Sequence, residues 1–75
     1  MSNKYKKIES TEYEEWICEK ERIDFYICKF HCNEYYECRA YFKGGDIDLG
    51  IAKSWSEAKH INRKYYIKLM KDGIL

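Results

Sequence analysis

The fold of this chain is decided by residues 54–74, which read SWSEAKHINRKYYIKLMKDGI. Ser54 and Glu57 have the spacing of a capping box, in which the serine hydroxyl accepts from the Glu57 amide while the carboxylate reaches back. Apolar residues then recur at intervals of three and four, the pattern of a helix with one face on a core; they are Ala58, Ile61, Tyr65 and Leu69. Gly73 fits a left-handed helix end. We therefore predict a helix over residues 54–71.

Three runs rich in Trp, Ile, Cys, Phe and Tyr precede this helix, and their alternation of apolar and polar residues indicates strands. They cover residues 13–18, 23–31 and 34–42. Residues 43–46 contain two glycines and fit a tight turn, and residues 47–52 are a candidate for a fourth, short edge strand. We predict an α+β fold, in which an antiparallel sheet of three to four strands packs against one C-terminal helix.

The strands can be set in register from the turns between them. A two-residue turn at Cys32 would pair Ile27 with Cys38. A four-residue first turn would place Trp16 opposite Phe25. In that register one sheet face is apolar and forms the core, with Trp16, Cys18, Ile23, Phe25, Ile27, Tyr36, Cys38, Ala40 and Phe42. The other face is aromatic and has no further helix to cover it; it carries Tyr26, Cys28, Phe30, Tyr35, Glu37, Arg39 and Tyr41.

The length of 75 residues leaves room for one domain with one core. Residues 1–11 are polar and basic around a single apolar residue, Ile8, so we predict a mobile N-terminal arm. Residues 12–75 then form the folded domain. Apolar residues make up 45% of the chain and charged residues 36%, which is typical of a globular protein rather than of a disordered one.

The charge is polarised along the chain although the net charge is only +1. Residues 1–50 hold 8 basic and 11 acidic residues, whereas residues 51–75 hold 6 basic and 2 acidic ones. The acidic residues concentrate between Glu9 and Asp24, and the basic residues lie on the predicted helix. A protein that binds nucleic acid without sequence preference usually has a strong basic excess, which this chain lacks.

The sequence shows no charged start followed by an apolar run and no stretch of 18 apolar residues. We therefore expect a cytoplasmic protein with no membrane partner, in the host cytoplasm if it is encoded by a phage. In that compartment the four cysteines are expected to be reduced thiols rather than disulfides.

Cys28, His31, Cys32 and Cys38 are the residues most suggestive of a metal, because thiolates and imidazoles are the ligands of structural zinc. Their spacing differs from that of a standard zinc knuckle, so we expect no cofactor and thiols that pack as small apolar groups. A zinc-stabilised adaptor stays open as an alternative. We also expect no enzyme, because neither His31 nor His60 has an evident nucleophile and orienting group beside it.

Two surfaces remain as candidates for binding. The first combines the aromatic sheet face with the acidic first strand and is predicted to contact a protein partner; its residues are Tyr26, Phe30, Tyr35, Glu37, Arg39, Tyr41, Glu14 and Glu15. The second is the outer side of the helix, predicted to contact nucleic acid if the alternative function holds, with Lys59, Arg63, Lys64 and Lys68. A second copy of the chain could also cover the sheet face, so a homodimer is a further alternative.

Residues 50–70 begin with a glycine and an apolar residue, followed by a serine and Glu-Ala that open a helix. This segment resembles the end of arm-binding domains of tyrosine recombinases and of double-stranded-RNA-binding domains. In the recombinase-like domains the sheet enters the major groove, and the resemblance assigns that role here to Tyr26, Arg39 and Tyr41. It implies a small DNA- or RNA-binding module.

A second resemblance is one of type. A very short chain that is rich in Lys, Ile and Tyr, has no proline and carries polarised charge resembles small phage proteins, among them anti-CRISPR inhibitors. This resemblance implies a non-catalytic inhibitor that binds a host protein, such as a CRISPR nuclease complex, and blocks its nucleic-acid or effector surface. The acidic first strand would complement an arginine-lined groove in that partner.

Overall fold

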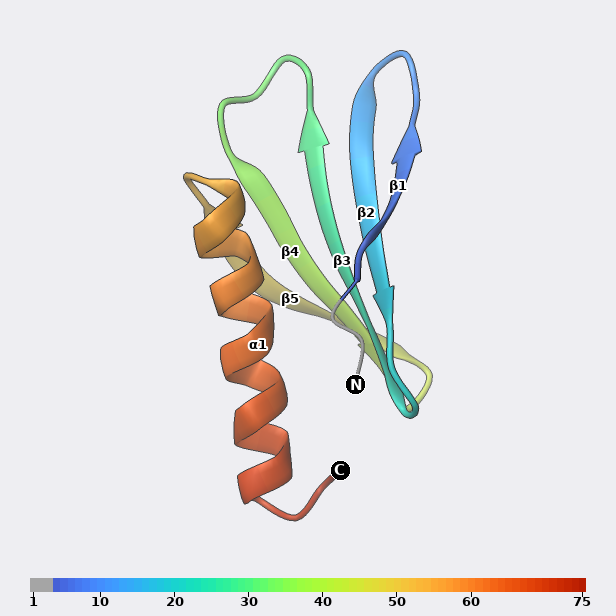
Figure 1. Cartoon of the computed structure of the whole chain (residues 1–75), viewed down its shortest axis with the longest axis vertical. Coiled ribbons are helices and arrows are strands. Elements are labelled where there is room, and N and C mark those ends of the chain that lie inside the picture. Colours follow the sequence, from blue (N-terminus) through green and yellow to red (C-terminus); the bar gives the residue numbers. More distant parts are fainter. Residues whose placement is uncertain (1–3) are drawn as a thin grey trace.

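The structure is a computed structural model that describes residues 4–75. It is an α+β fold in which a single antiparallel sheet is followed by one helix (Figure 1). Each strand pairs with the next one along the chain, so the sheet order is β1-β2-β3-β4-β5. The elements are β1 (Lys6–Glu9), β2 (Tyr13–Glu19), β3 (Ile23–Phe30), β4 (Tyr36–Phe42), β5 (Gly45–Ala52) and α1 (Trp55–Lys71). The prediction of three to four strands was wrong in number, because the sheet formed within residues 4–75 has five.

The additional strand is β1, which the sequence analysis placed in a mobile arm. Residues 6–9 pair antiparallel with β2, with Lys7 opposite Trp16, and the Lys7 ammonium lies 2.7 Å from the Glu14 carboxylate. All four residues of β1 are exposed. The strand therefore lacks the alternation of apolar and polar residues by which a half-buried strand is recognised in a sequence. Residues 1–3 of the predicted arm lie outside the described residues.

The helix begins and ends where the sequence predicted. The Glu57 amide donates to the Ser54 hydroxyl at 3.1 Å, as a capping box requires, and the Glu57 carboxylate accepts from the amide of Lys53, one residue before the N-cap. At the other end Gly73 adopts a φ of 72°, and the amide of Ile74 donates to the carbonyl of Leu69 at 3.0 Å. This is a Schellman end, in which glycine takes the left-handed conformation that other residues avoid.

The predicted register between β3 and β4 is confirmed, because Ile27 faces Cys38 and Phe25 faces Ala40. Between β2 and β3 the prediction was wrong by two residues: Trp16 lies opposite Ile27, and Cys18 lies opposite Phe25. The first turn is shorter than expected, with the amide of Lys20 donating to the carbonyl of Ile23. A shift of two residues preserves the faces of the strand, so the predicted core face is retained.

The edge strand β5 contains a bulge that the sequence analysis did not foresee. Gly50 adopts a φ of 104°, its amide donates to the Asp48 carboxylate at 2.9 Å, and the register with β4 shifts between Cys38 and Arg39. A bulge adds one residue and therefore reverses the alternation of side chains beyond it. As a result Ile51 points away from the helix, while Ala52 is buried beneath it.

The core lies between the helix and the middle of the sheet. Six residues of the predicted core face are buried, namely Cys18, Ile23, Phe25, Ile27, Cys38 and Ala40, and they are joined by Ala52 of β5 and by Ala58 and Leu69 of the helix. The other three residues predicted for this face, Trp16, Tyr36 and Phe42, are only partly buried. The predicted helix stripe omitted Asn62, which is only 1% exposed. A buried polar residue at this position is unusual and bears on the grooves described below.

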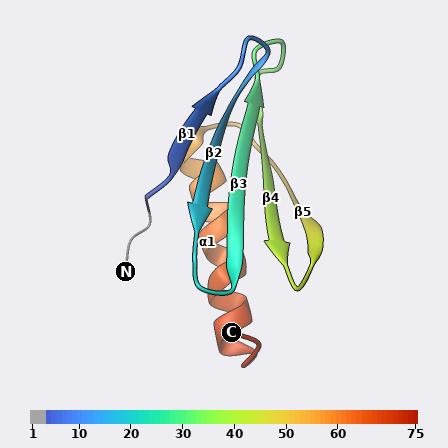
Figure 2. The same ribbon diagram turned by 90° about the vertical axis from the view of Figure 1, so that its right-hand side faces the viewer.

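The helix covers only part of one sheet face. It contacts β3, β4 and β5, whereas β1 and β2 stand away from its backbone (Figure 1). Viewed from the side, the helix lies behind the sheet, and the opposite face of the sheet is uncovered by any element within residues 4–75 (Figure 2). Within the same residues, no helix combines the length and the apolar character needed to span a membrane.

Candidate functional site

The sheet face that points away from the helix is here called the outer face. Strand alternation places on it apolar and aromatic residues from all five described strands; they include Ile8, Ile17, Tyr26, Cys28, Tyr41 and Ile51. The same alternation places six carboxylates and two basic residues between and around them, namely Glu15, Glu19, Asp24, Glu37, Asp46, Asp48, Lys6 and Arg39. The outer face is therefore a mixed surface, on which apolar side chains are interspersed with carboxylates.

Three apolar residues of the outer face are well exposed: Ile51 is 63% exposed, Ile8 45% and Tyr41 44%. Ile17, Tyr26 and Cys28 are half-buried. Ile8 and Ile51 lie on the edge strands, at the two ends of a row across the sheet that also holds Glu15, Cys28 and Glu37. The row alternates apolar and acidic side chains, so the face combines apolar contact area with negative charge.

The carboxylates of the outer face affect the titratable groups beside them. Partial burial raises the pKa of the Tyr26 phenol, and the nearby carboxylates of Asp24 and Asp46 raise it further. Burial likewise raises the pKa of the Cys28 thiol, followed by the effect of Glu15 and Glu37, which the Arg39 guanidinium opposes in part. Both groups thus have carboxylates close to them. Of the two basic residues, Lys6 lies 3.7 Å from the Glu19 carboxylate, which reduces its contribution to the face.

Most residues predicted for the protein-binding surface lie together. Tyr26, Phe30, Glu37, Arg39, Tyr41 and Glu15 are all on the outer face or at its end. Two others do not belong to it. Glu14 lies on the same side of β2 as Trp16, where it pairs with Lys7, since neighbouring residues of a strand point to opposite faces. Tyr35 lies in the loop that precedes β4.

The sequence analysis missed the outer residues of the two edge strands. Ile8 was placed in an arm, because Lys-Lys-Ile-Glu holds one apolar residue and shows no alternation that would identify a strand. Ile51 was not assigned to either face of the sheet, because the bulge at Gly50 decides the direction of its side chain. Asp46 and Asp48 could have been found from the alternating sequence Gly-Asp-Ile-Asp-Leu of β5, which places both carboxylates on one face.

The four residues suggested for zinc do not converge. Cys38 is fully buried beneath the helix, where its thiol lies 3.8 Å from the Ala58 carbonyl, and Cys28 points to the other face of the sheet. His31 and Cys32 are exposed in the loop after β3. Among residues 4–75, no group of three or more potential ligands is close enough to hold a metal ion. The zinc alternative therefore has no geometric basis in this fold.

The environment of Cys38 leads to a testable pH dependence. Burial, with smaller effects of Glu57 and Asp48, raises the pKa of the Cys38 thiol from 9.0 to about 11. Above pH 9 the unfolded chain loses this proton while the folded protein keeps it, so stability is expected to fall between pH 9 and 11. Urea unfolding across this range should show a steeper loss for the native chain than for Cys38→Ala, and equal slopes would contradict the assignment.

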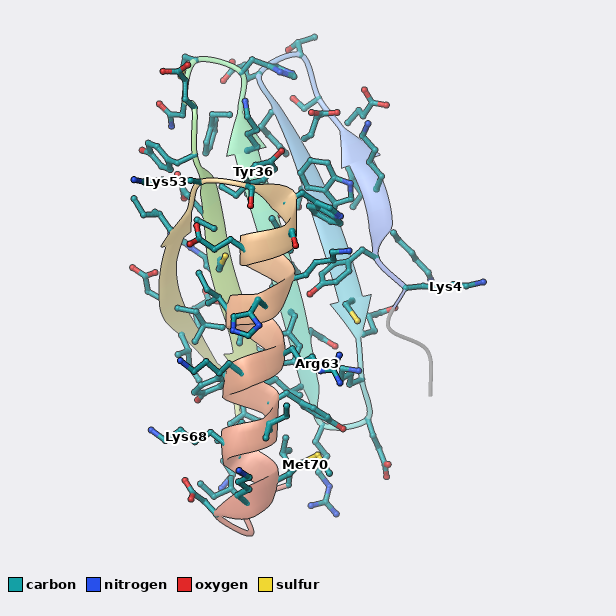
Figure 3. All side chains as sticks on the ribbon, turned by 60° about the vertical axis from the view of Figure 1, so that its left-hand side comes forward. Lys4, Tyr36, Lys53, Arg63, Lys68 and Met70 are labelled. Atoms are coloured by element: carbon teal, nitrogen blue, oxygen red, sulfur yellow. The ribbon has the colours of Figure 1, made fainter. Side chains whose placement is uncertain are left out.

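The basic residues predicted on the helix form two groups rather than one surface. With 100° between successive residues, Lys59 and Arg63 project from one flank of the helix, and Lys64 and Lys68 project from nearly the opposite one. Figure 3 shows this division, because Arg63 lies on the side of the helix that faces β2, whereas Lys68 points away from it. The first group borders a concave surface.

That concave surface consists of two adjoining depressions between the helix and the open side of β1 and β2. The first, here called the side groove, has a volume of about 570 Å³, and its lining includes Tyr5, Phe25, Asn62, Arg63, Tyr66 and Met70. The second, here called the tryptophan cleft, has a volume of about 500 Å³ and is lined by Tyr5, Lys7, Trp16, Tyr36, Trp55 and Lys59. Tyr5 and Lys59 line both.

Comparison with known proteins adds no relative of this chain. A scan against protein-family models found no match, and searches of curated proteins and of solved structures found none either. The functional argument therefore rests on the geometry and charge of the surfaces just described.

Proposed function

We propose that this protein is a non-catalytic binding protein whose outer face docks on a positively charged surface of another protein. The observation that supports this most strongly is the combination of exposed apolar side chains and six carboxylates on one face of the sheet. The apolar and aromatic residues supply contact area that loses water on binding, and the carboxylates between and around them select a partner of opposite charge.

The charge of the outer face distinguishes between possible partners. The outer face carries six carboxylates and two basic residues, Lys6 and Arg39. Its net negative charge would repel the phosphates of DNA or RNA, so the face is unsuited to nucleic acid. Two copies related by a two-fold axis would bring the same carboxylates together, which disfavours a homodimer through this face. The partner that is complementary in charge to the outer face is therefore a protein with a basic surface. Surfaces of that kind are characteristic of proteins that bind nucleic acid.

Such a partner would give the protein an inhibitory function. An acidic domain seated on a basic surface competes with nucleic acid for the same residues, and no chemistry is required of the inhibitor. A nuclease complex of a host defence system, which the resemblance to anti-CRISPR inhibitors implies, is a partner with such a surface. The proposal is therefore a stoichiometric inhibitor that acts by occlusion.

The proposal is tested with variants that alter the outer face without affecting the core. Asp46→Lys reverses a charge of the outer face and Tyr41→Ala removes an exposed ring from it, while Glu12→Lys makes the same charge change in the turn between β1 and β2. The native chain is used as bait in lysate of a host cell, the captured protein is identified and purified, and its affinity is then measured for each variant.

We expect the captured protein to lose its own binding to nucleic acid when this chain is added. Asp46→Lys and Tyr41→Ala should each weaken the complex by about tenfold or more, because one introduces repulsion and the other removes a buried contact. Glu12→Lys should leave the affinity unchanged. Equal affinities for all three variants, or a native chain that sediments as a dimer dependent on Tyr41, would overturn the proposal.

A further inference from the structure

The side groove and the tryptophan cleft together form a second surface whose chemistry is the reverse of the outer face. None of the described residues that line either depression is acidic. The basic residues along them include Lys59 and Arg63 from the helix, and Lys7 from β1. The protein thus presents a basic concave surface on one side of the sheet and an acidic flat surface on the other.

Aromatic rings form much of the wall of this surface. The ring centres of Trp16 and Trp55 are 4.7 Å apart, and Tyr36 lies 6.1 Å from Trp16 and 6.3 Å from Trp55. Tyr5 meets Trp55 edge-on at 5.5 Å. These four side chains are only partly buried, so parts of their rings remain accessible from the cleft. Tyr36 is visible near the start of the helix in Figure 3.

The positive charges lie close to the rings. The Lys59 ammonium is 5.5 Å from the centre of the Trp55 ring, and the Lys7 ammonium is 5.8 Å from that of Trp16. Lys7 also pairs with the Glu14 carboxylate, which raises the pKa of Lys7 and lowers that of Glu14, so its charge is largely balanced. Among residues 4–75, no carboxylate lies within ion-pair distance of Lys59 or Arg63, so both can offer their charge to an anionic ligand.

One polar group inside this surface lacks a partner. Asn62 is buried, and its amide nitrogen donates to the Tyr5 hydroxyl at 3.1 Å, but its amide oxygen has no hydrogen-bond partner among residues 4–75. Rotating the amide by 180° would exchange the two atoms and still leave one unpaired. A buried amide atom without a partner costs about 1 to 3 kcal/mol, which calls for a functional reason.

We propose that the side groove and the tryptophan cleft bind single-stranded nucleic acid, with bases against the exposed rings and phosphates beside Lys59 and Arg63. Aromatic rings interleaved with cations are the combination that holds single strands, because every base has a face for stacking and every nucleotide has a charge. An acidic peptide would satisfy the cations but would leave the rings without a stacking partner. A duplex keeps its bases stacked inside and cannot offer their faces.

The inference is tested by tryptophan fluorescence, because both tryptophans of the chain line the cleft. The full chain is titrated at low salt with single-stranded DNA or RNA of about 12 nucleotides, a length within the range bound by small domains of this kind. The same titration with duplex DNA of equal length and with polyglutamate provides the comparisons. We expect quenching by both single strands, at least about tenfold weaker binding of the duplex, and no quenching by polyglutamate.

Two variants locate the site. Arg63→Glu should reduce the affinity for single strands by about tenfold or more, whereas Lys68→Glu, the same change on the opposite flank of the helix, should reduce it by less than about twofold. Trp55→Leu should also reduce the affinity, with Trp16 as the remaining reporter and circular dichroism as the check of folding. Because Arg63 is exposed, Arg63→Glu is expected to fold, and it still tests the site if Trp55→Leu does not fold.

Several outcomes would overturn the inference. The first is the absence of quenching by any single strand at low salt. A second is equal loss of affinity in Arg63→Glu and Lys68→Glu, which would show attraction by the whole helix rather than binding in the cleft. A third is equal binding of polyglutamate, which would identify the surface as one for acidic peptides. These outcomes concern the helix side of the sheet and leave the proposal for the outer face unaffected.

Discussion

Replacing Phe25 by alanine is expected to lower the free energy of unfolding by about 3 to 5 kcal/mol. Phe25 is 2% exposed and lies in the larger core cluster, opposite Ala40 and edge-on to the Tyr66 ring at 6.1 Å. Its removal leaves a cavity that a helix held by both caps cannot readily close. A domain of this size has a total stability of only about 4 to 11 kcal/mol, so the variant should be largely unfolded at moderate temperature.

Urea unfolding followed by tryptophan fluorescence measures this effect. Tyr41→Ala is the matched control, because it removes an aromatic ring from the exposed face of the neighbouring strand and should change the stability by no more than about 0.5 kcal/mol. A loss below about 1 kcal/mol in Phe25→Ala would contradict the location of the core between the helix and β3.

Replacing Asn62 by leucine is expected to raise the free energy of unfolding by about 1 to 2 kcal/mol. The change removes the unpaired amide oxygen, and leucine has a higher helix propensity than asparagine. The side groove next to it gives space for the larger side chain, and the Tyr5 hydroxyl, which loses its donor, is only partly buried. A buried polar residue that reduces stability is expected where a site needs it.

The Asn62→Leu variant is measured in two ways. Thermal or urea unfolding gives the change in stability, and titration with a single-stranded oligonucleotide gives the change in affinity. We expect stability to rise while affinity falls, because the variant removes a hydrogen-bonding group from the floor of the groove. A loss of stability would show that the amide supports the fold, and that the Tyr5 hydrogen bond outweighs the unpaired oxygen.

The helix and the central strands could be predicted from the sequence because their signals are local. The capping residues Ser54 and Glu57 and the glycine end at Gly73 are each decided by a few neighbouring residues. The pairing of β3 with β4 follows from alternation and from the turn between them, and the face that forms the core follows in turn. These predictions fixed most residues of the outer face as well.

The edges of the sheet could not be predicted in the same way. β1 is held by backbone pairing with β2 and buries little, so its sequence lacks the apolar residues that identify a strand. The face on which Ile51 lies depends on the bulge at Gly50, a feature of backbone conformation rather than of composition. The exposed residues Ile8 and Ile51 were missed for these reasons.

The side groove and the tryptophan cleft depend on the position of the helix across the sheet. The sequence shows which helix residues are apolar, but the helix lies over β3, β4 and β5 and leaves β1 and β2 open. This offset brings Tyr5 and Trp16, far from the helix in sequence, beside Trp55. Contacts between residues so distant along the chain have no local signal.

The central claim, that the outer face is the docking surface for a basic protein, is tested most directly by nuclear magnetic resonance. The chain is labelled with nitrogen-15, and amide shifts are recorded as the captured partner is added. The perturbed amides are expected to lie on the outer side of β3, β4 and β5, including those of Tyr26, Arg39 and Ile51, while the helix flank at Lys64 and Lys68 is unchanged. Perturbations confined to the helix, with the amides of Tyr26 and Ile51 unmoved, would contradict the claim.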